Sequence, residues 1–398
     1  MKEMVHSYKI LIVSLSITLL CTMASYQRNT IWADDYTLWS DTLSKSSQKP
    51  RVYNNLGLVY LGQGHYQKAT ATLTTALEKS IAILITDSSG LLSGEDKKNI
   101  ESPSVLKHAP HIAEIYNNLG NSYLRQDNWD QALASYKKAL TLKPRYSKAY
   151  YNMGVVYNLQ GLPDKAIEVL TMALTLKPSY PEAYNKLGAA FRTQGLYQNA
   201  IEAYKKALTL RQDYLDAHVN LASLYYDRGN YPQAIDQYSV LLTFQPERAD
   251  VYYNLGNSYK QLGKLDEAVT AYDRALVIDH TIVNALYNLG IVYNQQKNYD
   301  NAIQSFRNAI QLKPDHIDAY NNLGISYHGK GLYEEAITAY NQALRLNPDY
   351  FASHLNLALL YAEQGNVNKA QHHLNKASMV EPTHPAVALI RRKILEPR

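Results

Sequence analysis

The sequence predicts an all-α solenoid, a stack of helical hairpins, because one column of small residues recurs with a constant period. Gly or Ala stands every 34 residues, at Gly120, Gly154, Gly188, Ala222, Gly256, Gly290, Gly324 and Ala358. When this residue is numbered position eight, nine units begin at residues 50, 113, 147, 181, 215, 249, 283, 317 and 351. A fixed period of this length indicates a repeat architecture.

Further columns divide each unit into two helices. Every unit has Ala at position twenty, and eight of nine have Ala at position twenty-seven, where Leu241 is the exception. Large apolar or aromatic residues recur with helical spacing at positions four, seven, eleven and twenty-four, on both sides of a Gly at position fifteen such as Gly161. A Pro such as Pro144 or Pro178, separated from the next unit by two residues, can end the second helix.

The glycines at position eight predict close contact between the two helices of a unit. Gly inside a helix costs about 0.5 to 1 kcal/mol relative to Ala. Seven of the nine units carry Gly there, so the array would be weakened unless packing compensates. We therefore expect the helices to approach closely at positions eight, twenty and twenty-seven, with Tyr and Leu side chains filling the space around them.

These columns, with Tyr in place of the more usual Trp at position four, resemble the tetratricopeptide repeat. The resemblance extends over about residues 50 to 384. It implies a right-handed superhelix of helix-turn-helix repeats whose first helices line a concave groove. It also implies that the groove binds segments of other proteins and that the array itself is non-catalytic.

The spacing of the units predicts the domain organisation. Gly57 and Gly120 are 63 residues apart, so the first unit, residues 50–112, carries an insertion between about 80 and 110 after a second helix that extends to about Ile85. Eight contiguous repeats occupy residues 113–384. Residues 385–398 are predicted to form a C-terminal capping helix with Val387, Ile390 and Ile394 on one face, and residues 29–49 a juxtamembrane or N-capping segment.

Residues 1–28 are predicted to be a membrane anchor or a signal segment. Ile10 to Tyr26 is a run of 17 uncharged residues, at the lower limit for a membrane-spanning helix. Lys2 and Lys9 before it favour a cytoplasmic N-terminus and an extracytoplasmic array, periplasmic or lumenal. A cleaved signal, which would give a secreted protein, and a buried helix of a soluble protein remain alternatives. The aromatic residues that follow, Trp32, Tyr36 and Trp39, suit either a membrane interface or packing under the first repeat.

A column of asparagines marks the candidate binding face. The pentapeptide Tyr-Asn-Asn-Leu-Gly occurs three times, and its second Asn is position six. The nine residues at this position are Asn55, Asn118, Asn152, Lys186, Asn220, Asn254, Asn288, Asn322 and Asn356. Asn is a poor helix former, so local propensity does not explain the column.

An Asn side chain carries an acceptor and two donors, which suits bidentate pairing with the backbone of an extended peptide. The column resembles the asparagine ladder of the O-linked N-acetylglucosamine transferase repeat domain, which implies that it holds peptide segments. The alternative is that Asn belongs to the general repeat pattern and was copied with it.

Other residues of the first helices are candidates for ligand contact. Lys186 and Arg192 make the fourth unit locally basic, which would attract an acidic segment. Four tyrosines at positions five and twelve are expected at the inner surface: Tyr151, Tyr226, Tyr253 and Tyr287. Acidic residues at position two give the rim mixed sign: Glu114, Glu182, Asp216, Asp250 and Asp318. No unit has basic residues at both positions two and six, which argues against a carboxylate clamp.

The composition gives no indication of nucleic acid, metal or cofactor binding. The net charge of +5 is spread along the chain, apart from the basic triplet at residues 391–393. Cys21 is the only cysteine. The histidine pairs, His108 with His111 and His372 with His373, lack the cysteines and carboxylates that would complete a zinc site. No Gly-rich phosphate loop or nucleophile elbow was found.

The sequence therefore predicts a non-catalytic scaffold that binds partner proteins at a membrane. Residues 28–57 are also similar to the join between membrane helices and repeats in the transmembrane and tetratricopeptide mannosyltransferase type. That similarity supports a second hypothesis, in which the chain is the C-terminal portion or a split partner of a polytopic membrane glycosyltransferase acting on proteins. A soluble O-linked N-acetylglucosamine transferase is not favoured, because its catalytic domain follows the repeats and 14 residues follow them here.

Overall fold

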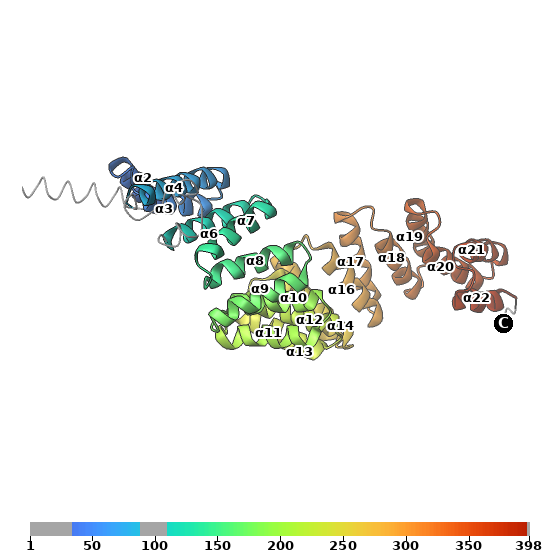
Figure 1. Ribbon diagram of the computed structural model, residues 1–398. Helices are drawn as coiled ribbons and strands as arrows, with labels where there is room; N and C mark the ends of the chain where they lie inside the picture. Colours follow the sequence, from blue (N-terminus) through green and yellow to red (C-terminus); the bar gives the residue numbers. More distant parts are fainter. Residues whose placement is uncertain (1–33, 88–109, 396–398) are drawn as a thin grey trace, which may run out of the picture. The chain divides into compact units, whose positions relative to one another are not determined.

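The protein is described from a computed structural model, in which residues 34–87 and 110–395 are placed. These residues form 20 α-helices and no strand. The fold class predicted from the sequence, an all-α array of paired helices, is confirmed for this part of the chain (Figure 1). Two compact units are distinguished, residues 1–212 and 213–398, and each is described by itself.

The first unit consists of one leading helix and four helical hairpins. The leading helix is α2 (Asp35–Lys45), which packs on the first hairpin. The hairpins are α3 (Pro50–Gly62) with α4 (Tyr66–Asp87), α6 (Pro110–Leu124) with α7 (Trp129–Leu142), α8 (Ser147–Leu159) with α9 (Pro163–Leu176), and α10 (Pro181–Thr193) with α11 (Tyr197–Leu210). In α4 the helix runs two residues beyond the expected end at Ile85.

The second unit consists of five helical hairpins and ends in a single helix. Its hairpins are α12 (Leu215–Asp227) with α13 (Tyr231–Phe244), α14 (Ala249–Gln261) with α15 (Leu265–Ile278), α16 (Val283–Gln295) with α17 (Tyr299–Leu312), α18 (Ile317–Gly329) with α19 (Tyr333–Leu346), and α20 (Phe351–Glu363) with α21 (Val367–Val380). The last helix, α22 (Pro385–Leu395), buries Val387, Ile390 and Ile394 against the preceding hairpin.

The close approach predicted at position eight is confirmed. A Cβ atom added to Gly120 would lie 2.5 Å from the Tyr136 ring, and one added to Gly154 would lie 2.5 Å from Leu170. In both hairpins the large residue belongs to the second helix, at position twenty-four. The glycine is therefore required because the opposing side chain occupies the space of its missing methyl group.

Position fifteen, between the two helices, is left-handed in every repeat. Seven repeats have Gly there, for example Gly195 with φ +82°. The other two have Asp127 with φ 56° and Lys297 with φ 58°. Gly adopts this region without a steric penalty, whereas a residue with a Cβ does not. The turn geometry is thus imposed by the packing of the hairpins and is kept even where the residue is unfavourable.

The first helices form the inner layer of each unit. Consecutive first helices contact one another directly, as α6 does with α8, α8 with α10, and α16 with α18. No pair of consecutive second helices makes comparable contact within the described residues. In a curved stack the layer on the inside is the more closely spaced, so the first helices line the concave side.

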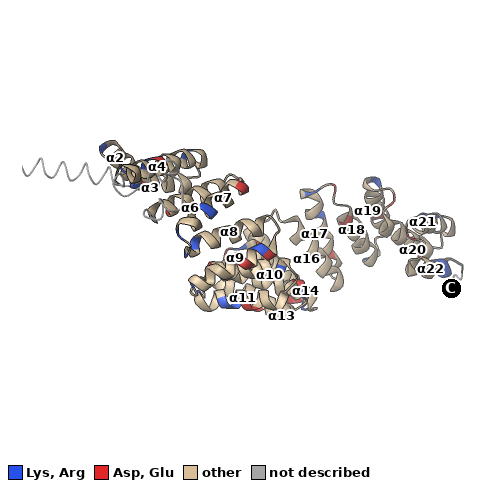
Figure 2. Cartoon of the chain, viewed as in Figure 1, with Lys and Arg blue, Asp and Glu red and all other residues tan. Residues whose placement is uncertain are grey.

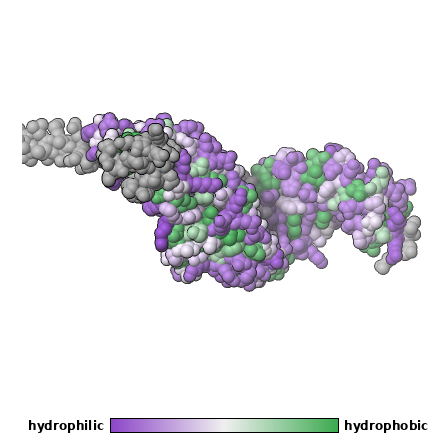
Figure 3. Space-filling model, viewed as in Figure 1, coloured by the Kyte–Doolittle hydropathy of each residue, from purple (hydrophilic) through white to green (hydrophobic). Residues whose placement is uncertain are grey.

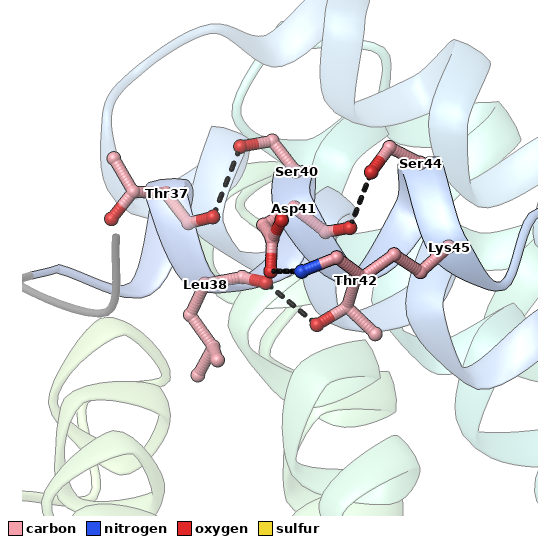
Figure 4. A network of polar contacts seen from close by, with 7 residues as sticks. All are labelled: Thr37, Leu38, Ser40, Asp41, Thr42, Ser44 and Lys45. Atoms are coloured by element: carbon pink, nitrogen blue, oxygen red, sulfur yellow. Dashed lines mark hydrogen bonds and ion pairs between the residues drawn. The ribbon is translucent and has the colours of Figure 1, made fainter. Parts of the chain in front are cut away.

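Side chains of helix α2 form hydrogen bonds with its own backbone, and the helix packs on the first hairpin. Asp34 and Thr37 form a capping box at its start, with the Thr37 amide donating to Asp34 Oδ1 at 2.8 Å. Along the helix, hydroxyl groups donate to carbonyl oxygens one turn earlier, such as Thr42 to Leu38 at 2.7 Å (Figure 4). The Tyr36 ring lies 5.9 Å from the Tyr60 ring of α3, so this aromatic residue packs beside the first hairpin.

Part of the predicted organisation lies outside the described residues. The predicted anchor at residues 10–26, Trp32, residues 88–109 of the insertion and residues 396–398 belong to this group. Among the helices of the described part, none has the length and apolarity needed to span a bilayer. Charged residues of both signs are scattered along the chain (Figure 2), and hydrophobic surface appears as separate patches among hydrophilic residues (Figure 3).

Candidate binding face on the first helices

All nine position-six residues are half-buried on the first helix of their repeat. Five of the asparagines donate a hydrogen bond from Nδ2 to the position-five residue of the preceding repeat. The acceptor is another Asn in three cases: Asn118 to Asn54 at 3.0 Å, Asn152 to Asn117 at 2.9 Å, and Asn356 to Asn321 at 3.0 Å. It is a Tyr hydroxyl in two: Asn288 to Tyr253 at 3.3 Å, and Asn322 to Tyr287 at 3.2 Å. We call this series the amide ladder.

Neighbouring groups that act only as donor or only as acceptor fix the orientation of two of these amides. Lys260 Nζ donates to Asn288 Oδ1 at 3.0 Å, so the Nδ2 of Asn288 faces the preceding repeat and also reaches Asn257 at 2.9 Å. The Nδ2 of Asn322 donates to the backbone oxygen of Asp318 at 2.8 Å. Because a lysine cannot accept and a carbonyl cannot donate, these two amides cannot be reversed.

Several ladder amides keep a free acceptor. The Oδ1 atoms of Asn118, Asn152, Asn322 and Asn356 accept no hydrogen bond within the described residues. Across residues 34–87 and 110–395, none of these four oxygens is among the buried side-chain polar atoms that lack a partner. The four ladder oxygens are therefore open to solvent. The bidentate pairing expected from the sequence remains open at Asn118, Asn152 and Asn356, whereas Asn322 keeps only its oxygen and Asn288 has used both ends.

Asn254 differs from the other ladder positions because Val219 stands at position five of the preceding repeat. Valine offers no acceptor, and the Asn254 side chain makes no hydrogen bond within the described residues. Both ends of this amide are thus available. Asn55, at the start of the array, accepts only a long 3.5 Å bond from Asn54.

The remaining candidate residues are partly occupied by neighbours. The four tyrosines are half-buried, and each packs beside another ring, as Tyr151 does with Tyr180 at 5.0 Å and Tyr226 with Tyr231 at 5.4 Å. Tyr287 lies 4.9 Å from His316. Arg192 lies near Tyr204: burial raises the pKa of this phenol to about 12, and the Arg192 charge opposes that rise.

Three candidate residues line one hollow in the first unit. This hollow, of about 740 Å³, is open to solvent; α8 and the end of α6 with the turn after it form most of its wall, and the end of α3, the start of α4 and one residue of α10 complete it. Its walls carry Asn121, Arg125, Tyr151, Asn152, Val155 and Lys186. We call it the Lys186 hollow. The structure thus brings Tyr151, Asn152 and Lys186 together, although they come from two different repeats.

Sequence reasoning missed the acceptors of the ladder and a second set of amides. The acceptors Asn54, Asn117 and Asn321 are the first Asn of the pentapeptide Tyr-Asn-Asn-Leu-Gly, so the doublet itself carried the signal. At position nine, Asn121 accepts from Tyr136 at 2.8 Å and Asn257 from Tyr272 at 2.7 Å. Each is paired with the residue at position twenty-four of its own hairpin.

Two histidines of the last hairpin form a close pair. His354 and His373 approach with their Nδ1 atoms 3.0 Å apart, and His354 Nε2 lies 2.9 Å from the Pro348 carbonyl. No group of three potential metal ligands occurs in the described part of the chain. His108, from the other sequence pair, lies outside it.

Family profiles for the tetratricopeptide repeat match most of the chain. One matches residues 111–179, 145–213 and 281–349, and others match 50–78, 222–263, 256–297 and 327–394. The helical hairpins and the small-residue contacts described above are those that this repeat requires. The chain belongs to the tetratricopeptide repeat family, whose members are protein-protein interaction scaffolds, and no enzymatic domain was found.

Several solved structures are similar to part of the chain. A crystal structure of MamA is 31% identical and covers 42% of this chain and 92% of its own, with a TM-score of 0.41. YrrB, described as a TPR protein with an unusual peptide-binding site, is 23% identical and covers 50% and 100%, with a TM-score of 0.44.

A tetratricopeptide repeat protein from Parabacteroides merdae is 22% identical and covers 63% and 99%, with a TM-score of 0.46. No curated protein matches. The family profiles establish the repeat and no closer relationship. The resemblances to the two transferase families therefore stay predictions.

Proposed function

We propose that this scaffold holds extended segments of partner proteins along the face formed by its first helices. The position-six residues are the principal contacts, and the tyrosines at positions five and twelve flank them. The observation that carries the proposal is the solvent-open row of Oδ1 atoms in the amide ladder. An unpaired carbonyl oxygen on a concave surface accepts a hydrogen bond readily, and a peptide in extended form has backbone N–H groups to donate.

The orientation of the ladder refines how a peptide would bind. Because the Nδ2 groups are directed to the preceding repeat, a ligand would meet the open oxygens of four ladder amides: Asn118, Asn152, Asn322 and Asn356. The ladder would therefore contact mainly the backbone N–H groups of the ligand. Such contacts do not read side chains, so affinity would depend weakly on ligand sequence except where a charged residue such as Lys186 intervenes.

The proposal is tested by crosslinking and by substitution at Asn254. A photoreactive residue at Tyr253, which is half-buried beside Asn254, is expected to capture unstructured random-sequence peptides. The same residue at Val277, which is 75% exposed on the second helix of that hairpin, serves as the matched control. Asn254→Ala should reduce capture at Tyr253 without changing helicity. Equal capture at both sites, or capture unaffected by Asn254→Ala, would reject the groove.

We further propose that the array is tethered to a membrane through residues 10–26 and lies on the extracytoplasmic side, with secretion after signal cleavage as the alternative. The support is the uncharged run and the lysines that precede it. Protease added to intact cells or spheroplasts should then degrade the array. Full protection of the array, together with its recovery in the soluble cell fraction, would exclude both locations.

The glycosyltransferase hypothesis rests on residues 28–57 alone, which are similar to the join before the repeats in polytopic membrane transferases. In that case the array would present protein substrates to catalytic membrane segments encoded elsewhere. An open reading frame upstream of Met1 that encodes further apolar helices would support this hypothesis. A stop codon directly upstream, with no adjacent gene for such a protein, would argue against it.

A further inference from the structure

We propose that the Lys186 hollow is a subsite for an acidic segment of the partner protein. This inference rests on the proposed function, since it assigns the chemistry of the ligand to one part of the same groove. Lys186 is the single charged residue in the position-six column. It replaces the neutral amide that the other repeats carry, so the first unit has a specific charge where the rest of the ladder has none.

The cationic groups of the hollow are available to a ligand. The Lys186 Nζ makes no ion pair or hydrogen bond within the described residues, although the side chain is half-buried and its backbone oxygen accepts from Asn158 at 2.9 Å. Arg125, exposed on the same wall, likewise has no acidic partner in that part of the chain. A half-buried cation without a counter-charge interacts more strongly with an incoming anion than an exposed one does.

The acidic residues nearest in the repeat pattern are already neutralised. Glu182, at position two of the Lys186 repeat, pairs with Arg211. Glu114, at position two of the repeat that carries Arg125, lies 3.6 Å from Lys143. Asp127 is the one carboxylate on the wall of the hollow, and it leaves an excess of one positive charge there. The local field thus favours an anionic ligand.

The uncharged lining suits a carboxylate ligand as well. Asn121, Asn152 and Tyr151 are among the residues that line the hollow. A Glu or Asp side chain entering the hollow could bind Lys186 as an ion pair while its backbone follows the ladder. The volume of about 740 Å³ accommodates several residues of an extended chain.

The test uses the full chain and three labelled peptides of equal length, in which Ser alternates with Glu, Gln or Lys. The Glu peptide is expected to bind about tenfold more tightly than the Gln peptide, with an advantage that falls as salt increases. Lys186→Asn, which restores the column residue, should remove most of that advantage and leave the Gln peptide unchanged. Arg125→Gln should weaken binding of the Glu peptide to a smaller extent.

The control is Lys148→Asn, which removes an exposed lysine of α8 that does not line the hollow. It should leave all three affinities unchanged. Equal binding of the Glu and Gln peptides, or equal weakening of all peptides by Lys186→Asn, would overturn the acidic subsite while leaving the peptide groove in place. If none of the three peptides binds, the groove itself is rejected together with the subsite.

Discussion

The Nδ2 of Asn152 donates to Oδ1 of Asn117 at 2.9 Å, and this bond joins one helical hairpin to the next. Asn117 is 4% exposed, so its oxygen has little access to water as an alternative partner. A buried acceptor that loses its donor costs about 1 to 3 kcal/mol. The ladder is therefore a structural device as well as a candidate ligand-binding feature.

Asn152→Ala should accordingly lower the free energy of unfolding by about 1 to 3 kcal/mol, because it leaves Asn117 unsatisfied. Asn254→Ala should change it by less than about 0.5 kcal/mol, because Asn254 has no such partner. The midpoints of urea unfolding for the two variants provide the comparison. Equal losses would mean that the inter-repeat bond contributes nothing to stability.

Tyr340 is expected to tolerate loss of its hydroxyl group. Its Oη is buried without a partner, since Ile325 stands at position nine where Asn121 accepts from Tyr136 in an earlier repeat. Tyr340→Phe should be neutral or stabilising by up to about 1 kcal/mol, and Phe306 already occupies the same position in another repeat. Tyr136→Phe should instead cost about 1 kcal/mol. Thermal melting distinguishes them, and a greater loss for Tyr340→Phe would contradict the assignment.

Lys297 should be replaceable by Gly with a gain in stability. With φ 58° its backbone adopts the left-handed conformation, which residues with a Cβ mostly avoid. The other turns at this position mostly have Gly. Lys297→Gly is expected to stabilise by about 1 kcal/mol, and Asp127→Gly by less, because Asp tolerates this conformation better. Urea unfolding of both variants shows which of the two gains more stability. A loss of stability in Lys297→Gly would show that the side chain makes a compensating contact.

The His354 and His373 pair is expected to make stability depend on pH. Burial, reinforced by the positive charges of His354 and His372, lowers the pKa of His373 to about 4, and burial also lowers the pKa of His354. Between about pH 4 and pH 6.5 the unfolded chain then binds more protons than the folded chain. The contribution of the two neutral histidines to stability is complete above about pH 6.5 and is lost as the pH falls toward about 4.

His373→Gln is the matched variant, because Gln237 pairs with His218 at 2.9 Å in the corresponding place of another hairpin. Melting temperatures of the parent and of His373→Gln should be similar at neutral pH. As the pH is lowered to about 4, the melting temperature of the parent should fall by more than that of the variant. Parallel pH profiles would contradict a role for this pair.

The fold could be predicted from the sequence because its determinants are periodic along the chain. Small residues recur at fixed positions of every unit, as Gly120 does at position eight and Ala132 at position twenty. Their spacing alone indicates paired helices with close contact. The left-handed turn was equally predictable where Gly161 marks it. It was less evident at Lys297, since only the geometry of the stack shows that a lysine there adopts the glycine conformation.

The candidate site was predicted less completely because its hydrogen bonds join different repeats. The position-six column was visible, but whether an amide is free depends on position five of the preceding repeat, which varies from Asn117 to Tyr253 to Val219. The Lys186 hollow could not be inferred either. It combines Asn121 with Lys186, which lie 65 residues apart in the sequence.

The gap in the ladder between Val219 and Asn254 has a consequence for how the second unit opens. Where neighbouring hairpins exchange an amide bond, separating them exposes a polar pair as well as apolar surface. Between these two repeats the ladder contributes no such bond, because Val219 offers no acceptor. In a linear array, where each repeat is held by its neighbours, we expect this junction to part first under mechanical load and to show the earliest amide hydrogen exchange.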